Sequence, residues 1–124
     1  MQKGYIYKGK AEHSQENVFH PIVCLENITS DKDYFEACVL THSKGYGNIQ
    51  MEKTHFEPLD ENGNPYPFQY ENTCIVQKVF EKKAFWIDDK CIGKLSDSGL
   101  AFVLQHKKEF GPTIYYPGRL QGKR

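Results

Sequence analysis

The sequence predicts mainly β structure in a small α+β domain: a mostly antiparallel, barrel-like sheet with a C-terminal helix. Short apolar runs rich in β-branched and aromatic residues alternate with turn residues, which is typical of strands. Only one segment, beginning near Ser96, has convincing helical periodicity. With 39% apolar residues, the 124-residue chain can bury about two-thirds of its unfolded surface. We therefore expect one domain over residues 1–124, with residues 110–124 as a C-terminal tail.

The first half of the chain predicts three strands. "GYIYKG" begins the series and is followed by a polar loop, "KAEHSQEN". The continuous apolar run from Ile22 to Leu25 suits a strand that is covered on both faces, and Pro21 is tolerated at its start. After a turn in "ITSDKD", the segment Phe35–Thr41 predicts another buried strand.

The second half is less regular. "GYGNIQMEK" predicts a loop and then a polar edge strand, and residues 54–72 read as a long loop because they contain three prolines. "TCIVQKVFEKKAFWI" predicts one long strand, or two strands with a kink near Lys82-Lys83. "DDKCIGKL" is expected to form a short turn or helical piece, in which Gly93 serves a tight turn.

The helix is predicted from its cap and its periodicity. Ser96 can act as N-cap and Asp97 lies in the first turn, where a negative charge is favourable. "FGP" is expected to end the helix. Four side chains share one face: Leu100, Val103, Leu104 and Lys107.

The composition of the chain bears on its partners, its metal or cofactor sites and its cellular location. Sixteen basic and sixteen acidic residues cancel, so net charge does not indicate a nucleic-acid partner. The four cysteines lack the close pairing of zinc ligands, and we expect no metal site, no cofactor and small buried thiols of a reducing cytoplasm. No signal peptide or membrane-spanning stretch is predicted, which favours a cytoplasmic protein.

The end of the third strand carries an unusual group of polar side chains. Thr41, His42, Ser43 and Lys44 follow the apolar run directly, with a glycine beyond them. Two hydroxyls, an imidazole and an ammonium at a rigid strand end suit a phosphate site. An ordinary turn after a strand explains the same residues, and both interpretations stay open.

Three segments, in this order, resemble the MazF/PemK family of toxin ribonucleases, and a fourth matches the family's terminal helix in pattern. "HPIVCLENI" is similar to the family's second strand, and "FEACVLTHS" resembles its third. "NTCIVQKVFEKKAFWIDDKCIGKLS" resembles the late strand with its hydrophobic-Gly-x-Leu-Ser turn, and "DSGLAFVLQHKKEF" matches the terminal helix. The resemblance implies an SH3-like barrel and a homodimeric, metal-independent endoribonuclease, the toxin of a type II toxin–antitoxin system. Its partners would be single-stranded RNA and a cognate antitoxin.

The resemblance also implies site residues. The catalytic pair falls on His20 and Thr41, where the family usually has Arg or Lys at the first position. An imidazole can take a proton from the 2′-hydroxyl or give one to the leaving 5′-oxygen, and a hydroxyl or ammonium can stabilise the charged transition state. Substrate-binding positions are His42, Ser43, Lys44, Gln77, Lys78 and, in the family's first loop, His13.

Other functions remain open. A non-catalytic barrel of the same fold, binding protein or nucleic acid, explains the missing guanidinium, although Arg119 could supply one. The aromatic residues of the 54–72 loop could stack on RNA bases or pin the loop onto the barrel. A thiol-dependent hydrolase is disfavoured because the cysteines lie in core-like contexts.

Overall fold

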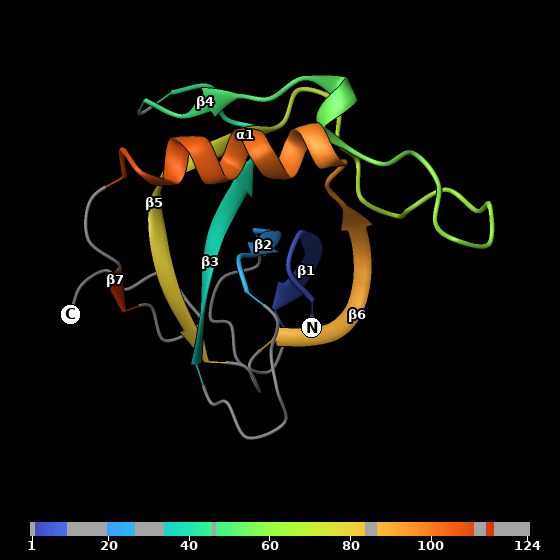
Figure 1. Cartoon of the computed structure of the whole chain (residues 1–124), viewed down its shortest axis with the longest axis horizontal. Helices are drawn as coiled ribbons and strands as arrows, with labels where there is room; N and C mark the ends of the chain where they lie inside the picture. Colours follow the sequence, from blue (N-terminus) through green and yellow to red (C-terminus); the bar gives the residue numbers. More distant parts are fainter. Residues whose placement is uncertain are drawn as a thin grey trace.

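In the part of the chain that the structure describes, a seven-stranded sheet forms the body of the molecule and one α-helix crosses it (Figure 1). The computed structural model describes residues 2–9, 20–26, 34–45, 47–83, 87–110 and 114–115. The elements are β1 (Tyr5–Gly9), β2 (Ile22–Cys24), β3 (Tyr34–Thr41), β4 (Ile49–Gln50), the 3₁₀ helix η2 (Lys53–His55), β5 (Cys74–Lys83), β6 (Ile87–Lys94), α1 (Asp97–Lys107) and β7 (Ile114–Tyr115).

The sheet is antiparallel along the path β4-β5-β3-β2-β1-β6, and β7 adds to β5 in parallel. This confirms the predicted α+β class, with mainly antiparallel strands and one helix. The sequence left two alternatives for residues 73–87, one long strand or two strands with a kink. The structure has two strands, β5 and β6. The predicted turn or helical piece in "DDKCIGKL" is wrong, because Asp88–Lys94 continues β6. Its backbone pairs with β1, so tertiary pairing outweighs the low strand propensity of "DDK".

The two edges of this path are joined by one short segment. After β4 pairs with β5, the chain passes through η2 and Phe56 forms an isolated bridge to Leu95, just beyond β6. The Glu57 N–H donates to the Lys94 carbonyl at 2.9 Å. Within the described residues no continuous ladder joins β4 to β6, so these contacts link the edges without closing the sheet.

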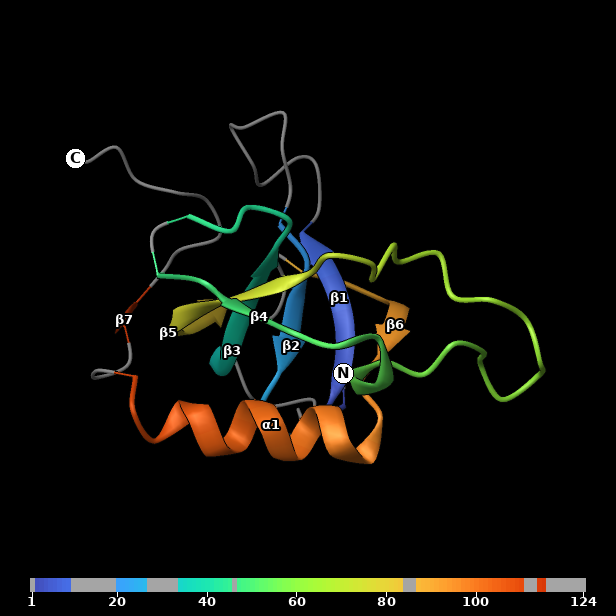
Figure 2. The ribbon, with the colours of Figure 1, turned by 90° about the horizontal axis from the view of Figure 1, so that it is seen from above.

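Two apolar clusters occupy the two faces of the sheet. The first contains Val23 and Leu40 from the strands together with Val103 from α1, and the helix lies over it (Figure 2). The second, on the opposite face, includes Ile22 and Val39. Successive residues of a strand point to opposite faces. The burial of all four residues from Ile22 to Leu25 confirms the predicted strand with two covered faces.

The helix begins at the predicted cap and ends at Lys107, shortly before the predicted stop in "FGP". The Gly99 N–H donates to Ser96 Oγ at 3.1 Å, so Ser96 is the N-cap. Of the predicted face, Val103 is fully buried and Leu100 packs against the first cluster. Lys107 Nζ lies 3.0 Å from Glu36 Oε1 on β3, which ties the end of the helix to the sheet.

The first turn of α1 is fastened to η2 by hydrogen bonds. The Ser96 N–H donates to the His55 carbonyl at 3.0 Å, and the hydroxyls of Ser96 and Ser98 donate to the Thr54 carbonyl at 2.6 and 3.1 Å. Gly99 is buried here, and a Cβ on it would lie 1.9 Å from the His55 carbonyl oxygen. Only glycine permits this approach of helix and backbone.

Aromatic residues anchor the long loop to the body. Phe56 and Phe68 are buried in the first cluster, and the rings of Phe56 and Tyr70 stack with centroids 5.5 Å apart. These contacts support the pinning interpretation for these three residues. Between its anchored ends the loop projects to one side of the molecule (Figure 2).

Gly93 has a different role from the predicted tight turn. It lies inside β6, opposite Ile6, and a Cβ at this position would lie 3.1 Å from Ile6 Cδ1 and from Phe68 Cβ. The missing side chain makes room for the loop to pack against the sheet. The tight-turn prediction is therefore wrong.

All four cysteines are free thiols, and three of them, Cys24, Cys38 and Cys74, are buried as predicted. Burial raises the pKa of the Cys38 thiol to about 12. In the part of the chain that the structure describes, no helix has the length and apolar character needed to cross a membrane.

Candidate functional site

The register of β2 and β3 brings His20 and Thr41 opposite one another. Ile22 pairs with Val39, and the Leu40 N–H donates to the Pro21 carbonyl at 2.9 Å, which extends the same register past the end of β2. The next pair in this register is His20 with Thr41. Since Pro21 and Leu40 share a hydrogen bond, this next pair is of the non-hydrogen-bonded kind, in which Cα atoms lie about 4.5 Å apart.

Both side chains lie on the same face of the sheet. Ile22 and Val39 belong to the second cluster, and their neighbours two positions away, His20 and Thr41, follow by alternation. His20 is exposed, whereas Thr41 keeps only 8% of its surface accessible. An imidazole in solvent therefore stands beside a hydroxyl set in the rim of the apolar cluster.

The Thr41 hydroxyl is held in a fixed orientation. The backbone N–H of Ser43 donates to Thr41 Oγ1 at 3.2 Å, a local turn in which the hydroxyl is the acceptor. Because one lone pair is occupied, the hydroxyl proton is left to be donated elsewhere. This arrangement suits a donor to an anionic oxygen, and it is also common in ordinary turns.

The predicted Lys78 is exposed on β5. It lies between Val76 and Phe80, which pack against the second cluster, in the stretch where the β3–β5 register shifts. β5 lies next to β3, and Thr41 pairs with Cys74. Lys78 is therefore four residues along β5 from the partner of Thr41, and the end of this face carries an imidazole and a hydroxyl on two neighbouring strands.

The other predicted residues are placed differently. His42 points to the first-cluster face, with its ring centroid 6.5 Å from that of Phe68, so it does not join His20 and Thr41. Ser43 and Lys44 are exposed in the turn beyond β3. The Gln77 side-chain amide donates to the Gly47 carbonyl, and this amide group therefore holds the loop that precedes β4.

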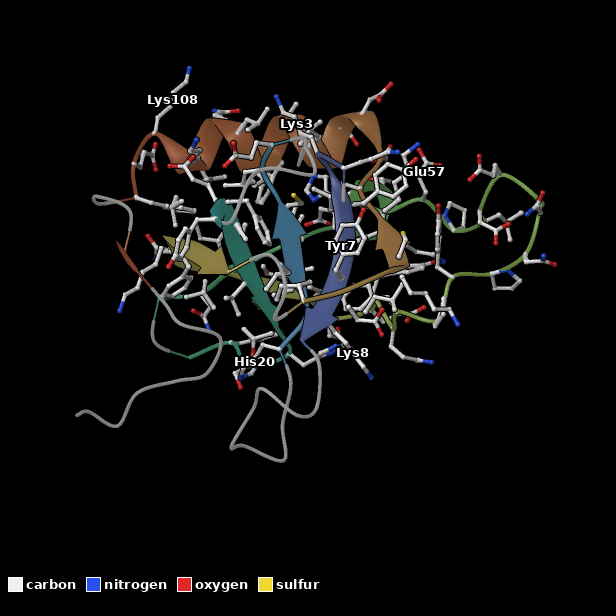
Figure 3. The ribbon with its side chains drawn as sticks, turned by 90° about the horizontal axis from the view of Figure 1, so that it is seen from below. Lys3, Tyr7, Lys8, His20, Glu57 and Lys108 are labelled. Atoms are coloured by element: carbon white, nitrogen blue, oxygen red, sulfur yellow. The ribbon has the colours of Figure 1, made fainter. Side chains whose placement is uncertain are left out.

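Two residues of the sequence analysis, His13 and Arg119, lie outside the described residues. The position of Lys8, by contrast, was missed. Continuing the pairing of Tyr7 with Ile22 places Lys8 next to Pro21, and Figure 3 shows Lys8 and His20 at the same end of the sheet. The signal in the sequence was a lysine at a strand end, which is too common to single out.

The arrangement places an imidazole beside a hydroxyl, with exposed lysine side chains nearby, and these groups suit the binding of a phosphate. Among the described residues, no group of three or more His, Cys, Asp or Glu side chains is placed to hold a metal ion. Lys8 and Lys44 are exposed near this end of the sheet. By alternation from Tyr7, which belongs to the second cluster, Lys8 lies on the face opposite His20 and Thr41.

Comparison with protein-family models and with curated proteins finds no match for this chain.

Proposed function

We propose that this chain is a metal-independent endoribonuclease that cleaves single-stranded RNA, with His20 and Thr41 at its active site. The proposal is supported by the register of β2 and β3, whose continuation past Ile22 and Pro21 sets these two residues opposite one another on one face of the sheet. They come from the two strands that resemble the second and third strands of the MazF/PemK family. The proposal includes the family's role, the toxin of a type II toxin–antitoxin system in the cytoplasm, with a homodimer and a cognate antitoxin.

The fold is consistent with this proposal. We assign the sheet to the SH3-like barrel type because the segment from β4 to Phe56 reaches from one edge of the sheet to the other. A helix follows the last long strand, as in the family. The barrel assignment and the proposed activity are independent of each other, since a fold does not determine an activity.

The proposed reaction uses the substrate's own 2′-hydroxyl as nucleophile. The 2′-oxygen forms a bond to phosphorus while the bond from phosphorus to the 5′-oxygen breaks, which gives a 2′,3′-cyclic phosphate and a 5′-hydroxyl. His20 accepts the proton of the 2′-hydroxyl as general base, and a water molecule gives the leaving 5′-oxygen its proton. The Thr41 hydroxyl and the Lys78 ammonium donate to the non-bridging oxygens as negative charge develops there.

A cleavage assay with an unstructured RNA in EDTA tests this mechanism. We expect His20→Ala to lower the rate by about 10²–10⁴-fold, the range for loss of an acid–base group. Thr41→Val keeps the side-chain shape but removes the donor, and it should cost about 10²-fold or more, whereas Thr41→Ser should retain activity. Lys90→Ala, an exposed change on β6, is the matched control. If the wild type leaves the RNA intact, or if both site variants cleave it normally, the proposal is wrong.

A second candidate function is a non-catalytic binding module of the same fold. The low exposure of Thr41, 8%, favours it, because a hydroxyl near the rim of an apolar cluster is reached less easily by a phosphate. Induced expression separates the two functions. Growth arrest that His20→Ala abolishes supports the nuclease, and unaffected growth supports the module.

A further inference from the structure

A second group of polar and aromatic side chains lies at the opposite end of the same sheet face. Tyr5, at the start of β1, is the register partner of Lys94 at the end of β6. The Lys94 ammonium lies 5.1 Å from the centroid of the Tyr5 ring, a cation–π contact. Tyr5 packs against the second cluster, so it shares a face with His20 and Thr41. Both Tyr5 and Lys94 are partly exposed.

The long loop adds a second tyrosine to this group. The Phe68 N–H donates to the Ile92 carbonyl at 2.9 Å, and this bond holds the loop against β6 near Tyr66. Partial burial raises the pKa of Tyr66 to about 12, with smaller contributions from Cys91 and Tyr5, which lie close to it. Tyr66 and Cys91 are both partly exposed.

The hydroxyls of Tyr5 and Tyr66 have no hydrogen-bond partner among the described residues. Tyr7, labelled in Figure 3, differs from them: it is buried, and its hydroxyl accepts the Gln2 N–H at 2.8 Å. The two partly exposed phenols and the Lys94 ammonium thus present donors and ring surface to solvent, while the buried phenol is used within the fold. Such a group is a stronger sign of a binding site than a single polar strand end, because three separate elements, β1, β6 and the loop, bring its side chains together.

We propose that Tyr5, Tyr66 and Lys94 form a binding subsite for one unpaired nucleotide of single-stranded RNA. The proposal rests on the proposed function, whose substrate it extends beyond the cleaved bond. Aromatic side chains are the usual platforms for unstacked bases, and an ammonium is a point donor to phosphate.

The charged residues near Tyr5, Tyr66 and Lys94 indicate where the base and the phosphate of the nucleotide would bind. Asp60 and Glu61 lie near the Tyr66 phenol, and their negative charge raises its pKa slightly further. Carboxylates repel a phosphate but accept hydrogen bonds from the amino groups of bases. The base therefore belongs at Tyr66 and the phosphate at Lys94, which can turn from the Tyr5 ring towards it.

The distance to His20 suits a single bound strand. Tyr5 and Gly9 are four residues apart on β1, about 13 Å at about 3.3 Å per residue. Continuing the register of β1 and β2 puts Gly9 opposite His20. An extended RNA that follows the β1 direction can thus place one nucleotide at the subsite and another phosphate at His20, a few nucleotides away.

Binding is measured in the His20→Ala background, in which the RNA should stay intact. Fluorescence anisotropy of a labelled, unstructured RNA oligonucleotide gives Kd. We expect Tyr66→Ala to raise Kd about 5- to 100-fold, the range for loss of one stacked base. Tyr66→Phe keeps the ring and should retain most of the affinity, and Lys94→Met should raise Kd and reduce its salt dependence. Thermal unfolding of each variant establishes that it is folded.

The outcomes separate this subsite from the nuclease activity. If wild-type protein cleaves RNA while Tyr66→Ala and Lys94→Met leave Kd unchanged, the subsite is wrong and the proposed function stands. If the wild type does not cleave RNA but Kd rises in both variants, the subsite stands without the nuclease. If no RNA binds at any salt concentration, both are overturned.

Discussion

Gly99 is the position in α1 where one added carbon atom should have a large effect on stability. Its Cβ would lie 1.9 Å from the carbonyl oxygen of His55 and 2.8 Å from the carbonyl carbon, both backbone atoms that cannot rotate away. The first turn of the helix and η2 must therefore separate in Gly99→Ala. A separation breaks the bonds that fasten them, those from Ser96 and Ser98 to the carbonyls of Thr54 and His55.

The cost can be worked out from these contacts. Three hydrogen bonds at about 0.5–1.5 kcal/mol each amount to roughly 1.5–4.5 kcal/mol. Alanine gains about 1 kcal/mol over glycine in intrinsic helix propensity. The expected net loss in the free energy of unfolding is therefore about 0.5–3.5 kcal/mol. Without the close contact the same substitution would stabilise the helix, so the sign of the change is the decisive observable.

Urea unfolding, followed by circular dichroism, measures this change. Gly45→Ala is the matched control, because its Cβ would have no atom within 4 Å, and it should lie within about 0.5 kcal/mol of wild type. Ala101→Gly, at an exposed position of the same helix, should cost about 1 kcal/mol and calibrates the propensity. A Gly99→Ala protein as stable as the wild type, or more stable, would refute the reasoning.

Two further predictions concern the packing of β6 and the titration of η2. Gly93→Ala should destabilise the protein by about 1–3 kcal/mol, because its Cβ meets Ile6 and Phe68 at 3.1 Å, and adding Ile6→Val, which removes the Cδ1 atom, should recover part of the loss in urea unfolding. His55 Nδ1 accepts the Glu52 N–H at 2.9 Å, and burial lowers the pKa of His55 below 6.5. The unfolded chain therefore binds this proton more strongly, so the free energy of unfolding should fall as pH drops through 6.5 and level off below the folded-state pKa. His55→Gln, which does not titrate, should show a shallower decrease between pH 7 and pH 5, and an equal slope in both proteins would contradict the assignment.

The strands and the helix could be predicted where local chemistry and tertiary structure agree. The run from Ile22 to Leu25 is apolar throughout, so its burial on two faces follows from composition. Ser96 is followed by Asp97 and a helical pattern, and the helix begins there. These segments specify their own conformation and need little information from the rest of the chain.

The strand β6 could not be predicted because its residues have low strand propensity, and the strand forms only by pairing with a segment distant in the sequence. "DDKCIGKL" is polar, glycine-containing and short of β-branched residues, yet its backbone pairs with β1 at the far end of the sequence. The roles of Gly93 and Gly99 were hidden for the same reason. Each glycine is required by an atom of another segment, Phe68 in one case and His55 in the other.

The candidate site was only partly accessible from the sequence. Neighbouring strand ends suggested that His20 and Thr41 meet, but the face that each side chain occupies depends on register, which shifts with a single residue. Register separates His42 from the pair, and a register shift between β3 and β5 falls beside Lys78. Tyr5, Tyr66 and Lys94 gave no combined signal, because three separate elements bring them together.

The pairing of β1 with β6 has a consequence for how the polypeptide acquires its structure. Tyr5 pairs with Lys94, so one edge of β1 stays unpaired until β6, almost ninety residues later in the chain, has been synthesised. Loop closure over such a span slows folding, and an unsatisfied edge invites association between nascent chains. Refolding should therefore be slow for so small a domain, and fragments ending before Ile87 should aggregate rather than persist as monomers.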